Sequence, residues 1–161
     1  MNNFLLKKNV LKVSKFLDKS SLNCKLIQLN ETARSAIEAA KALNKEVGSI
    51  VKSLSFKDTD YNFYLCLVSG DKYLSEKKLA KITKQKITKA NADEVKEQTG
   101  FTIGGVSPFS HKIEPKRIFI DKNLNRFNIV YAAAGHPFVV FGIEFNQLVK
   151  FSRGEIVDLT I

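Results

Sequence analysis

The fold is decided by the stretch Ile50-Val51-Lys52-Ser53-Leu54-Ser55-Phe56, which is followed after a short polar break by Tyr61-Asn62-Phe63-Tyr64-Leu65-Cys66-Leu67-Val68. Apolar and polar residues alternate from Leu54 to Phe56, which is typical of a strand with one buried face. The second run is apolar almost throughout, as expected for a strand that is buried on both faces. The stretch therefore predicts two strands at the centre of a sheet, ended by the Ser69-Gly70-Asp71 turn.

Further strands and helices are expected on both sides of this pair. The patterns predict strands at residues 25–29, 117–120, 128–133, 138–143 and 155–159. They predict helices at residues 4–16, 75–84, 91–98 and 144–150, and another that begins at Asn30 or Thr32 and places Ala33, Ala36, Ile37, Ala40 and Leu43 on one face. Because strands outnumber helices and short turns join several of them, we expect an α+β fold. Its sheet is predicted to be mixed, largely antiparallel, curled and barrel-like, with the helices packed outside.

The chain has 161 residues, enough for one domain, and no linker or internal repeat divides it. We expect a single domain over residues 1–161, in which residues 1–24 form a helical N-terminal extension. Asn91 and Glu94 are expected to form a capping pair at the start of the helix at 91–98, and Gly100 to end it.

Basic residues outnumber acidic ones. The chain has 26 Lys and Arg against 16 Asp and Glu, which gives a net charge of +10. Such an excess is typical of a protein with a polyanionic partner, although a lysine-rich surface without a specific partner gives the same charge. Lysines are concentrated between Lys72 and Lys89, where Lys77, Lys81 and Lys84 are predicted to form a ridge on the exposed face of a helix.

Cysteine spacing and hydropathy indicate the compartment. Cys24 and Cys66 lie far apart and fit neither a CxxC pair nor a metal site, so we expect buried, reduced thiols. The apolar run at residues 4–6 is too short for a signal peptide, and no segment has the length of a membrane span. These features favour a cytoplasmic protein that does not interact with a membrane, and no pattern requires a metal or a cofactor.

Lys52 is the one charged residue in its predicted strand. If its side chain points toward the concave face of the sheet, partial burial lowers its pKa and strengthens its attraction to an anion or a polarised carbonyl. If it points outward, it is an ordinary surface lysine of an alternating strand. Both orientations fit the residues alone.

The loop Thr99-Gly100-Phe101-Thr102-Ile103-Gly104-Gly105-Val106-Ser107-Pro108-Phe109 contains three glycines and a proline. Glycines let backbone N–H groups approach a ligand, and proline stiffens the loop, so the loop suits a carbonyl or a phosphate. A tight turn that merely reverses the chain has the same composition. Elsewhere, His111 and His136 are expected to be exposed turn residues, and Asp121 is expected to cap a turn.

Several motifs occur in the order and spacing of one known family. They are Thr32-Ala33, Ile50-Val51-Lys52-Ser53-Leu54, Gly70-Asp71, Leu79-Ala80, Thr99-Gly100, Gly104-Gly105-Val106-Ser107-Pro108, Asp121 and Ala134-Gly135. With them the chain, from about Lys25 to Ile161, resembles the YbaK/EbsC family of aminoacyl-tRNA deacylases. The same fold resembles the editing domain inserted in bacterial prolyl-tRNA synthetases.

This resemblance implies a YbaK-like trans-editing enzyme that hydrolyses the ester bond of mischarged aminoacyl-tRNA, with cysteine, alanine or another small residue as the amino acid. It implies that Lys52 is the catalytic residue, acting by charge or as a base, without a metal or a cofactor. It places substrate binding at Gly104, Gly105, Val106, Ser107, Pro108 and Gly135. The N–H groups of Gly104, Gly105 or Val106 are then candidates to stabilise the oxyanion of the reaction.

The resemblance also implies tRNA as the partner, with an aminoacyl-tRNA synthetase as a further candidate. Candidate contacts with the tRNA backbone are Lys77, Lys81, Lys84, Lys86 and Lys89. Ser110 stands where the family usually has glycine, and a side chain there is expected to narrow the pocket or add a hydroxyl. This departure leaves an alternative open, a catalytically inactive tRNA- or synthetase-binding module of the same fold.

Overall fold

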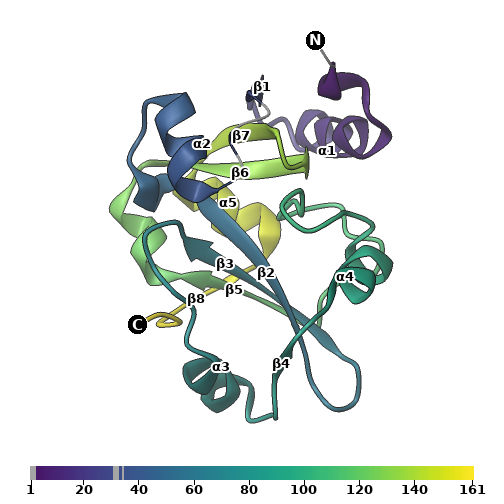
Figure 1. Ribbon diagram of the computed structural model, residues 1–161, viewed down its shortest axis with the longest axis vertical. Helices are drawn as coiled ribbons and strands as arrows, with labels where there is room; N and C mark the ends of the chain where they lie inside the picture. Colours follow the sequence, from purple (N-terminus) through teal and green to yellow (C-terminus); the bar gives the residue numbers. More distant parts are fainter. Residues whose placement is uncertain (1–2, 31–32, 34) are drawn as a thin grey trace.

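The computed structural model describes residues 3–30, 33 and 35–161 (Figure 1). The helices are α1 (Lys8–Lys19), α2 (Ala36–Leu43), α3 (Glu76–Thr83), α4 (Ala92–Thr99) and α5 (Phe145–Ser152), and the 3-10 turns are η1 (Phe4–Leu6), η2 (Val47–Ser49) and η3 (Lys122–Arg126). The strands are β1 (Leu26–Gln28), β2 (Val51–Lys57), β3 (Phe63–Ser69), β4 (Thr88–Lys89), β5 (Arg117–Asp121), β6 (Ile129–His136), β7 (Val139–Glu144) and β8 (Glu155–Val157). Each element predicted from the sequence has a counterpart, whereas β4, η2 and η3 were not predicted.

The strands form two sheets. One is antiparallel with the order β1-β7-β6, and the other has the order β4-β2-β3-β5-β8. In the second sheet β2 is antiparallel to β3 and β4, whereas β3 with β5 and β5 with β8 are parallel. The mixed, largely antiparallel α+β fold is thus confirmed. The sheet does not close into a barrel, however, because only an isolated bridge between Ile50 and Tyr131 links the two sheets within the described residues.

The stretch that predicts two central strands forms the centre of the second sheet. β2 pairs with β3 over seven residues, in a register that sets Lys52 opposite Val68. Every residue of β3 is buried, since both faces of the strand are covered. Leu65 belongs to the core shared with α1 and α5, and Cys66 belongs to the core that includes Leu79 of α3.

α2 differs from the prediction in its start and in one residue of its buried face. Its N-cap is Ser35, whose side chain accepts a hydrogen bond from the N–H of Glu38 (3.1 Å). Asn30 therefore does not cap the helix, and the other predicted cap, Thr32, lies outside the described residues. The predicted buried face is confirmed for Ala33, Ala36, Ala40 and Leu43, which belong to or pack against one core cluster. The exception is Ile37, which is 67% exposed.

The local signals around α4 are confirmed. Asn91 and Glu94 form the predicted capping box, and Gly100 ends the helix in a left-handed conformation. Capping depends on residues within one turn of each other, so the sequence alone carries the information. Both cysteines are free as expected, Cys66 buried and Cys24 partly buried.

The N-terminal helix packs into the core. Val10, Val13 and Leu17 of α1 are buried, and α1 packs against β6 of the three-stranded sheet (Figure 1). Gly135 of β6 permits this approach, because a Cβ atom there would lie 2.6 Å from the carbonyl oxygen of Asn9. Its φ of +91° is also one that glycine adopts readily.

Candidate functional site

A cavity of about 410 Å³ opens beside the first half of β2. Its lining residues are Ala33, Ser35, Ala36, Ala39, Ile50, Val51, Lys52, Ser53, Leu54, Ile103, Gly104, Val106, Tyr131, Ala133, Pro137 and Val140. We call it the β2 cavity. Lys52 and two residues of the glycine loop, Gly104 and Val106, therefore lie on the wall of one cavity, although about 50 residues separate them in the chain.

The β2 cavity lies at an edge of β2 that is largely unpaired. β3 covers the other edge along the whole strand, but β4 pairs only with Phe56 and Lys57. One further hydrogen bond runs from the N–H of Ala90 to the carbonyl of Ser55 (3.0 Å). An unpaired edge presents backbone donors and acceptors to a neighbour, so the short β4 leaves residues 51–54 open to a ligand.

The Lys52 side chain is partly buried, and its ammonium group faces the segment after β3. It donates a hydrogen bond to the carbonyl of Lys72 and lies 5.1 Å from the centre of the Tyr73 ring. Burial lowers the pKa of Lys52, while the negative charges of Asp71 and Asp121 act to raise it. Lys52 is therefore a partly desolvated cation on the wall of a cavity.

Asp71 and Asp121 are themselves fixed by hydrogen bonds. Asp121 is fully buried and accepts hydrogen bonds from the N–H groups of Ser69 (3.1 Å) and Asn123 (2.9 Å). The second contact is the turn cap predicted for Asp121. Arg126 forms an ion pair with Asp71 through both guanidinium nitrogens (2.7 and 3.1 Å), and this pair lowers the pKa of Asp71. Asp71 therefore stays anionic near Lys52.

Two residues of the glycine loop that line the β2 cavity have an N–H group without a hydrogen-bond partner among the described residues. Gly105 is not one of them, because its N–H donates to the carbonyl of Thr102 (2.9 Å). Gly105 instead packs against the β6–β7 turn, where a Cβ atom would lie 3.0 Å from the Cα of His136. No hydrogen bond within the described residues uses the N–H of Gly104 or Val106. Of the three predicted oxyanion donors, Gly104 and Val106 remain.

The other predicted substrate-binding residues lie elsewhere. Ser107 is buried, and its hydroxyl accepts a hydrogen bond from the N–H of Phe109 (3.0 Å). Pro108 lines a different cavity, and Gly135 lies beneath α1. None of the three is on the wall of the β2 cavity, so their role in binding substrate stays a prediction that rests on the family resemblance.

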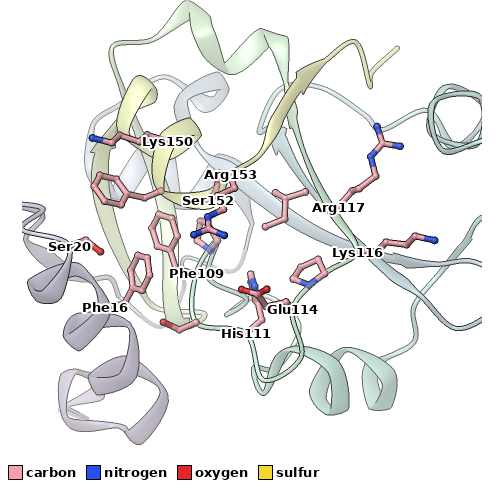
Figure 2. Close-up of a pocket in the computed structure, with 15 residues that line it drawn as sticks. Phe16, Ser20, Phe109, His111, Glu114, Lys116, Arg117, Lys150, Ser152 and Arg153 are labelled. Carbon is pink, nitrogen blue, oxygen red and sulfur yellow. The ribbon is translucent and has the colours of Figure 1, made fainter.

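A second cavity, of about 620 Å³, lies between α1, α5 and the segment after the glycine loop (Figure 2). Ser110 lines this cavity and not the β2 cavity, so its side chain does not narrow the space beside Lys52. Ser110 has a φ of +63°, in the left-handed region that favours glycine. The backbone conformation at this position thus explains why glycine is usual there in the family.

The two histidines are packed rather than exposed, contrary to the prediction. His111 is hydrogen-bonded through Nε2 to the carbonyl of Ser107 (2.6 Å), and burial lowers its pKa. The His136 ring stacks on Phe4 with 4.1 Å between ring centres, and burial lowers its pKa as well. Both turns are covered by neighbouring segments, which the local sequence does not reveal.

The five lysines proposed to contact tRNA are all exposed. Lys77 and Lys81 lie on α3, Lys84 follows it directly, and Lys86 and Lys89 lie on the way to and within β4. They are not part of the β2 cavity. Their contact with tRNA stays a prediction. Together they form a basic surface on the segment that begins shortly after Tyr73.

Several lining residues were not identified from the sequence. Four alanines, at positions 33, 36, 39 and 133, make much of the wall. Ser53 also lines the cavity, and its buried hydroxyl has no hydrogen-bond partner among the described residues. Ala33, Ala36 and Ala39 are spaced three residues apart, and this spacing is the signal that could have indicated a wall of small residues. No such signal exists for Ser53, because it lines the cavity only where β4 is too short to pair with β2.

The described residues also show what is absent from the site. Among them, no group of three or more His, Cys, Asp or Glu side chains is arranged to hold a metal ion. No helix in this part of the chain is long and apolar enough to span a membrane.

Comparison with known proteins gives a consistent result. The model of the aminoacyl-tRNA editing domain family matches residues 30–151. The uncharacterized protein YwhH of Bacillus subtilis (strain 168) is 32% identical over 127 residues, which cover 78% of this chain and 80% of YwhH. The proline–tRNA ligase of Thermosipho africanus (strain TCF52B) is 40% identical over 76 residues, which are 47% of this chain and 13% of the ligase.

Solved structures agree. A candidate trans-editing enzyme for prolyl tRNA synthetase superposes with a TM-score of 0.91 at 33% sequence identity, covering 97% of this chain and 99% of that chain. The hypothetical protein APE2540 superposes with a TM-score of 0.84 at 26% identity, covering 93% and 99%.

We predict that Ser110→Gly stabilises the protein by about 0.5–1 kcal/mol. A left-handed conformation costs a residue with a side chain about 1–2 kcal/mol, and glycine removes this cost. Glycine also raises the conformational entropy of the unfolded chain, which offsets only part of the gain in stability. Ser110→Ala retains the strain and serves as the control, with no expected gain. Urea unfolding curves measure both differences, and equal stability of the glycine and alanine variants would contradict the explanation.

Proposed function

We propose that this chain, which belongs to the aminoacyl-tRNA editing domain family, hydrolyses the ester bond between a small amino acid and the 3′ end of tRNA. The observation that carries the proposal is that Lys52, Gly104 and Val106 line the same cavity, and that the N–H groups of Gly104 and Val106 have no hydrogen-bond partner among the described residues. A cation and two backbone donors are the groups that a reaction at an ester carbonyl needs. The proposal places the protein in the cytoplasm, where tRNA is aminoacylated.

The size and lining of the β2 cavity favour a small aminoacyl group. Its volume of about 410 Å³ must accommodate the terminal ribose as well as the amino acid. Because the ribose takes part of this volume, the space left for the amino-acid side chain is limited. Alanine and cysteine, the small residues that the sequence analysis proposed, fit this description. The similarity to proline–tRNA ligases supports tRNA charged by a prolyl-tRNA synthetase as the substrate.

In the proposed reaction water attacks the ester carbonyl, and the bond to the ribose oxygen breaks. The carbonyl oxygen gains negative charge, which the N–H groups of Gly104 and Val106 stabilise. The unpartnered hydroxyl of Ser53 is available to orient the water or the ribose. A proton of the attacking water passes to the ribose oxygen. The products are the free amino acid and deacylated tRNA.

We assign Lys52 an electrostatic role. Its ammonium group donates to the carbonyl of Lys72, and the carboxylate of Asp71 favours its charged form. Burial acts in the other direction and lowers the pKa, so the charge is less shielded by water than that of a surface lysine. A less shielded cation attracts the developing oxyanion or the terminal phosphate more strongly.

Lys52→Ala is expected to lower the rate of deacylation of mischarged tRNA by about 100-fold or more, the scale of losing one electrostatic group at a developing oxyanion. The control is Lys57→Ala, which removes a lysine from the same strand that pairs with Glu94 and lies outside the β2 cavity. Release of labelled amino acid measures the rate. Wild-type turnover by Lys52→Ala would contradict the proposed site.

The pH dependence distinguishes charge from base catalysis. Since burial lowers the pKa of Lys52, the cation is lost at a lower pH than for an ordinary lysine. We predict that kcat/KM, corrected for spontaneous ester hydrolysis, falls as the pH rises through this lowered pKa. Lys52→Arg should lose the fall in the same range, because arginine stays charged. A rise of kcat/KM over that range would instead assign Lys52 as a base.

A further inference from the structure

Tyr73 is a large aromatic residue that the fold leaves uncovered. Its side chain is 76% exposed, although it lies in the short connection between β3 and α3. Most other aromatic side chains of the chain pack into the core or against it. Exposed aromatic rings are the surfaces on which unpaired nucleic-acid bases stack.

The ring lies directly beside the cation of the proposed active site. The Lys52 ammonium is 5.1 Å from the centre of the Tyr73 ring and donates to the carbonyl of the preceding residue, Lys72. In an aminoacyl-tRNA the ester and the terminal base are attached to the same ribose. An ester placed at Lys52 therefore brings the terminal base to within one sugar of Tyr73.

Hydrogen bonds to the C-terminal segment hold the backbone at Tyr73 and directly after it. The carbonyl of Tyr73 accepts a hydrogen bond from the N–H of Ile161 (3.0 Å), and Leu74 bridges to Thr160. Ser75 donates its N–H to Leu159 (2.8 Å) and caps α3. The ring is thus presented from a rigid segment, which reduces the entropy lost when a ligand binds to it.

The same segment leads into the basic surface. α3 begins at Glu76, and Lys77 and Lys81 lie exposed on it. These lysines place exposed cations on the element that directly follows Tyr73 in the chain. Cations there can bind the phosphates of the RNA strand whose terminal base stacks on Tyr73.

We propose that Tyr73 is the platform on which the terminal base of the tRNA 3′ end stacks when the ester enters the β2 cavity. This inference rests on the proposed function. It adds a binding residue for the nucleotide, separate from the groups that act on the ester. It also assigns a function to an exposed ring that contributes nothing to the core.

The test uses a short RNA hairpin with a single-stranded 3′ end, in which 2-aminopurine replaces the terminal adenine. Stacking on an aromatic ring quenches 2-aminopurine fluorescence, so binding to the wild-type chain and to Tyr73→Phe is expected to quench it. Tyr73→Ala is expected to abolish the quenching. With mischarged tRNA, Tyr73→Ala should raise KM by about tenfold, the scale of one lost base stack, with a smaller change in kcat.

Tyr61→Ala is the matched control. Tyr61 is 73% exposed and also lies beneath a lysine, with the Lys57 ammonium 5.5 Å from its ring centre. It stands at the far end of the β2–β3 hairpin, and Lys57 itself is roughly 17 Å along β2 from Lys52. Quenching should persist in this variant. Because the side chains of Tyr73 and Tyr61 are exposed, both alanine variants are expected to fold, and circular dichroism checks this.

The outcomes separate the two proposals. The role of Tyr73 would be overturned if Tyr73→Ala quenched the fluorescence as strongly as the wild-type chain does. It would also be overturned if Tyr61→Ala lost as much quenching as Tyr73→Ala. The quenching experiment uses uncharged RNA and needs no turnover. If the wild-type chain hydrolyses no mischarged tRNA but quenches through Tyr73, the hydrolytic function fails and the platform stands. If it hydrolyses and Tyr73→Ala leaves both KM and quenching unchanged, only the platform fails.

Discussion

The unpaired edge of β2 is the constraint on which the site depends. A strand in the middle of a sheet normally has neighbours on both sides, but β4 covers only Phe56 and Lys57. The backbone before them faces a cavity instead of another strand, and α2, the glycine loop and the β6–β7 sheet complete the wall. A longer β4 would give a more regular sheet and would leave no space for a ligand beside Lys52.

A second constraint is the balance of charge around Lys52. Burial disfavours its charged form, and Asp71 and Asp121 favour it. Arg126 and the Ser69 N–H fix these two carboxylates, so the acids do not move freely to neutralise the lysine. A cation that is partly desolvated but not cancelled is suited to attract negative charge that appears only during a reaction. The exposed lysines after Tyr73 act at longer range and are screened by salt.

The sequence predicted what local physics determines. Hydropathy along residues 50–68 was sufficient to place β2 and β3, and the capping box of α4 depends on residues only three positions apart. Lys52 stands out because it is the charged residue of an apolar strand, and the family resemblance implies its role. The same resemblance implies that the glycine loop binds substrate, and two of its residues, Gly104 and Val106, line the β2 cavity.

What the sequence missed depends on segments that are distant in the chain. The local sequence does not reveal that Gly135 lies beneath α1, where a Cβ atom would collide with the backbone of Asn9. The N–H of Gly105 is used within its own loop, which only the three-dimensional turn reveals. α2 is capped by Ser35 and not by Asn30, and the sheets are open where a barrel-like sheet was predicted. Tertiary contacts decide between such alternatives, and the local sequence does not contain them.

The central claim is that Lys52 and the glycine loop act on one acyl group in the β2 cavity. It is tested most directly by a crystal structure of the chain with an adenosine that carries alanine through an amide in place of the ester. Our account predicts the acyl carbonyl oxygen within hydrogen-bond distance of the N–H of Gly104 or Val106, with the Lys52 ammonium beside it. An analogue bound in the cavity of Figure 2 or on the lysine surface, with the β2 cavity empty, would contradict it.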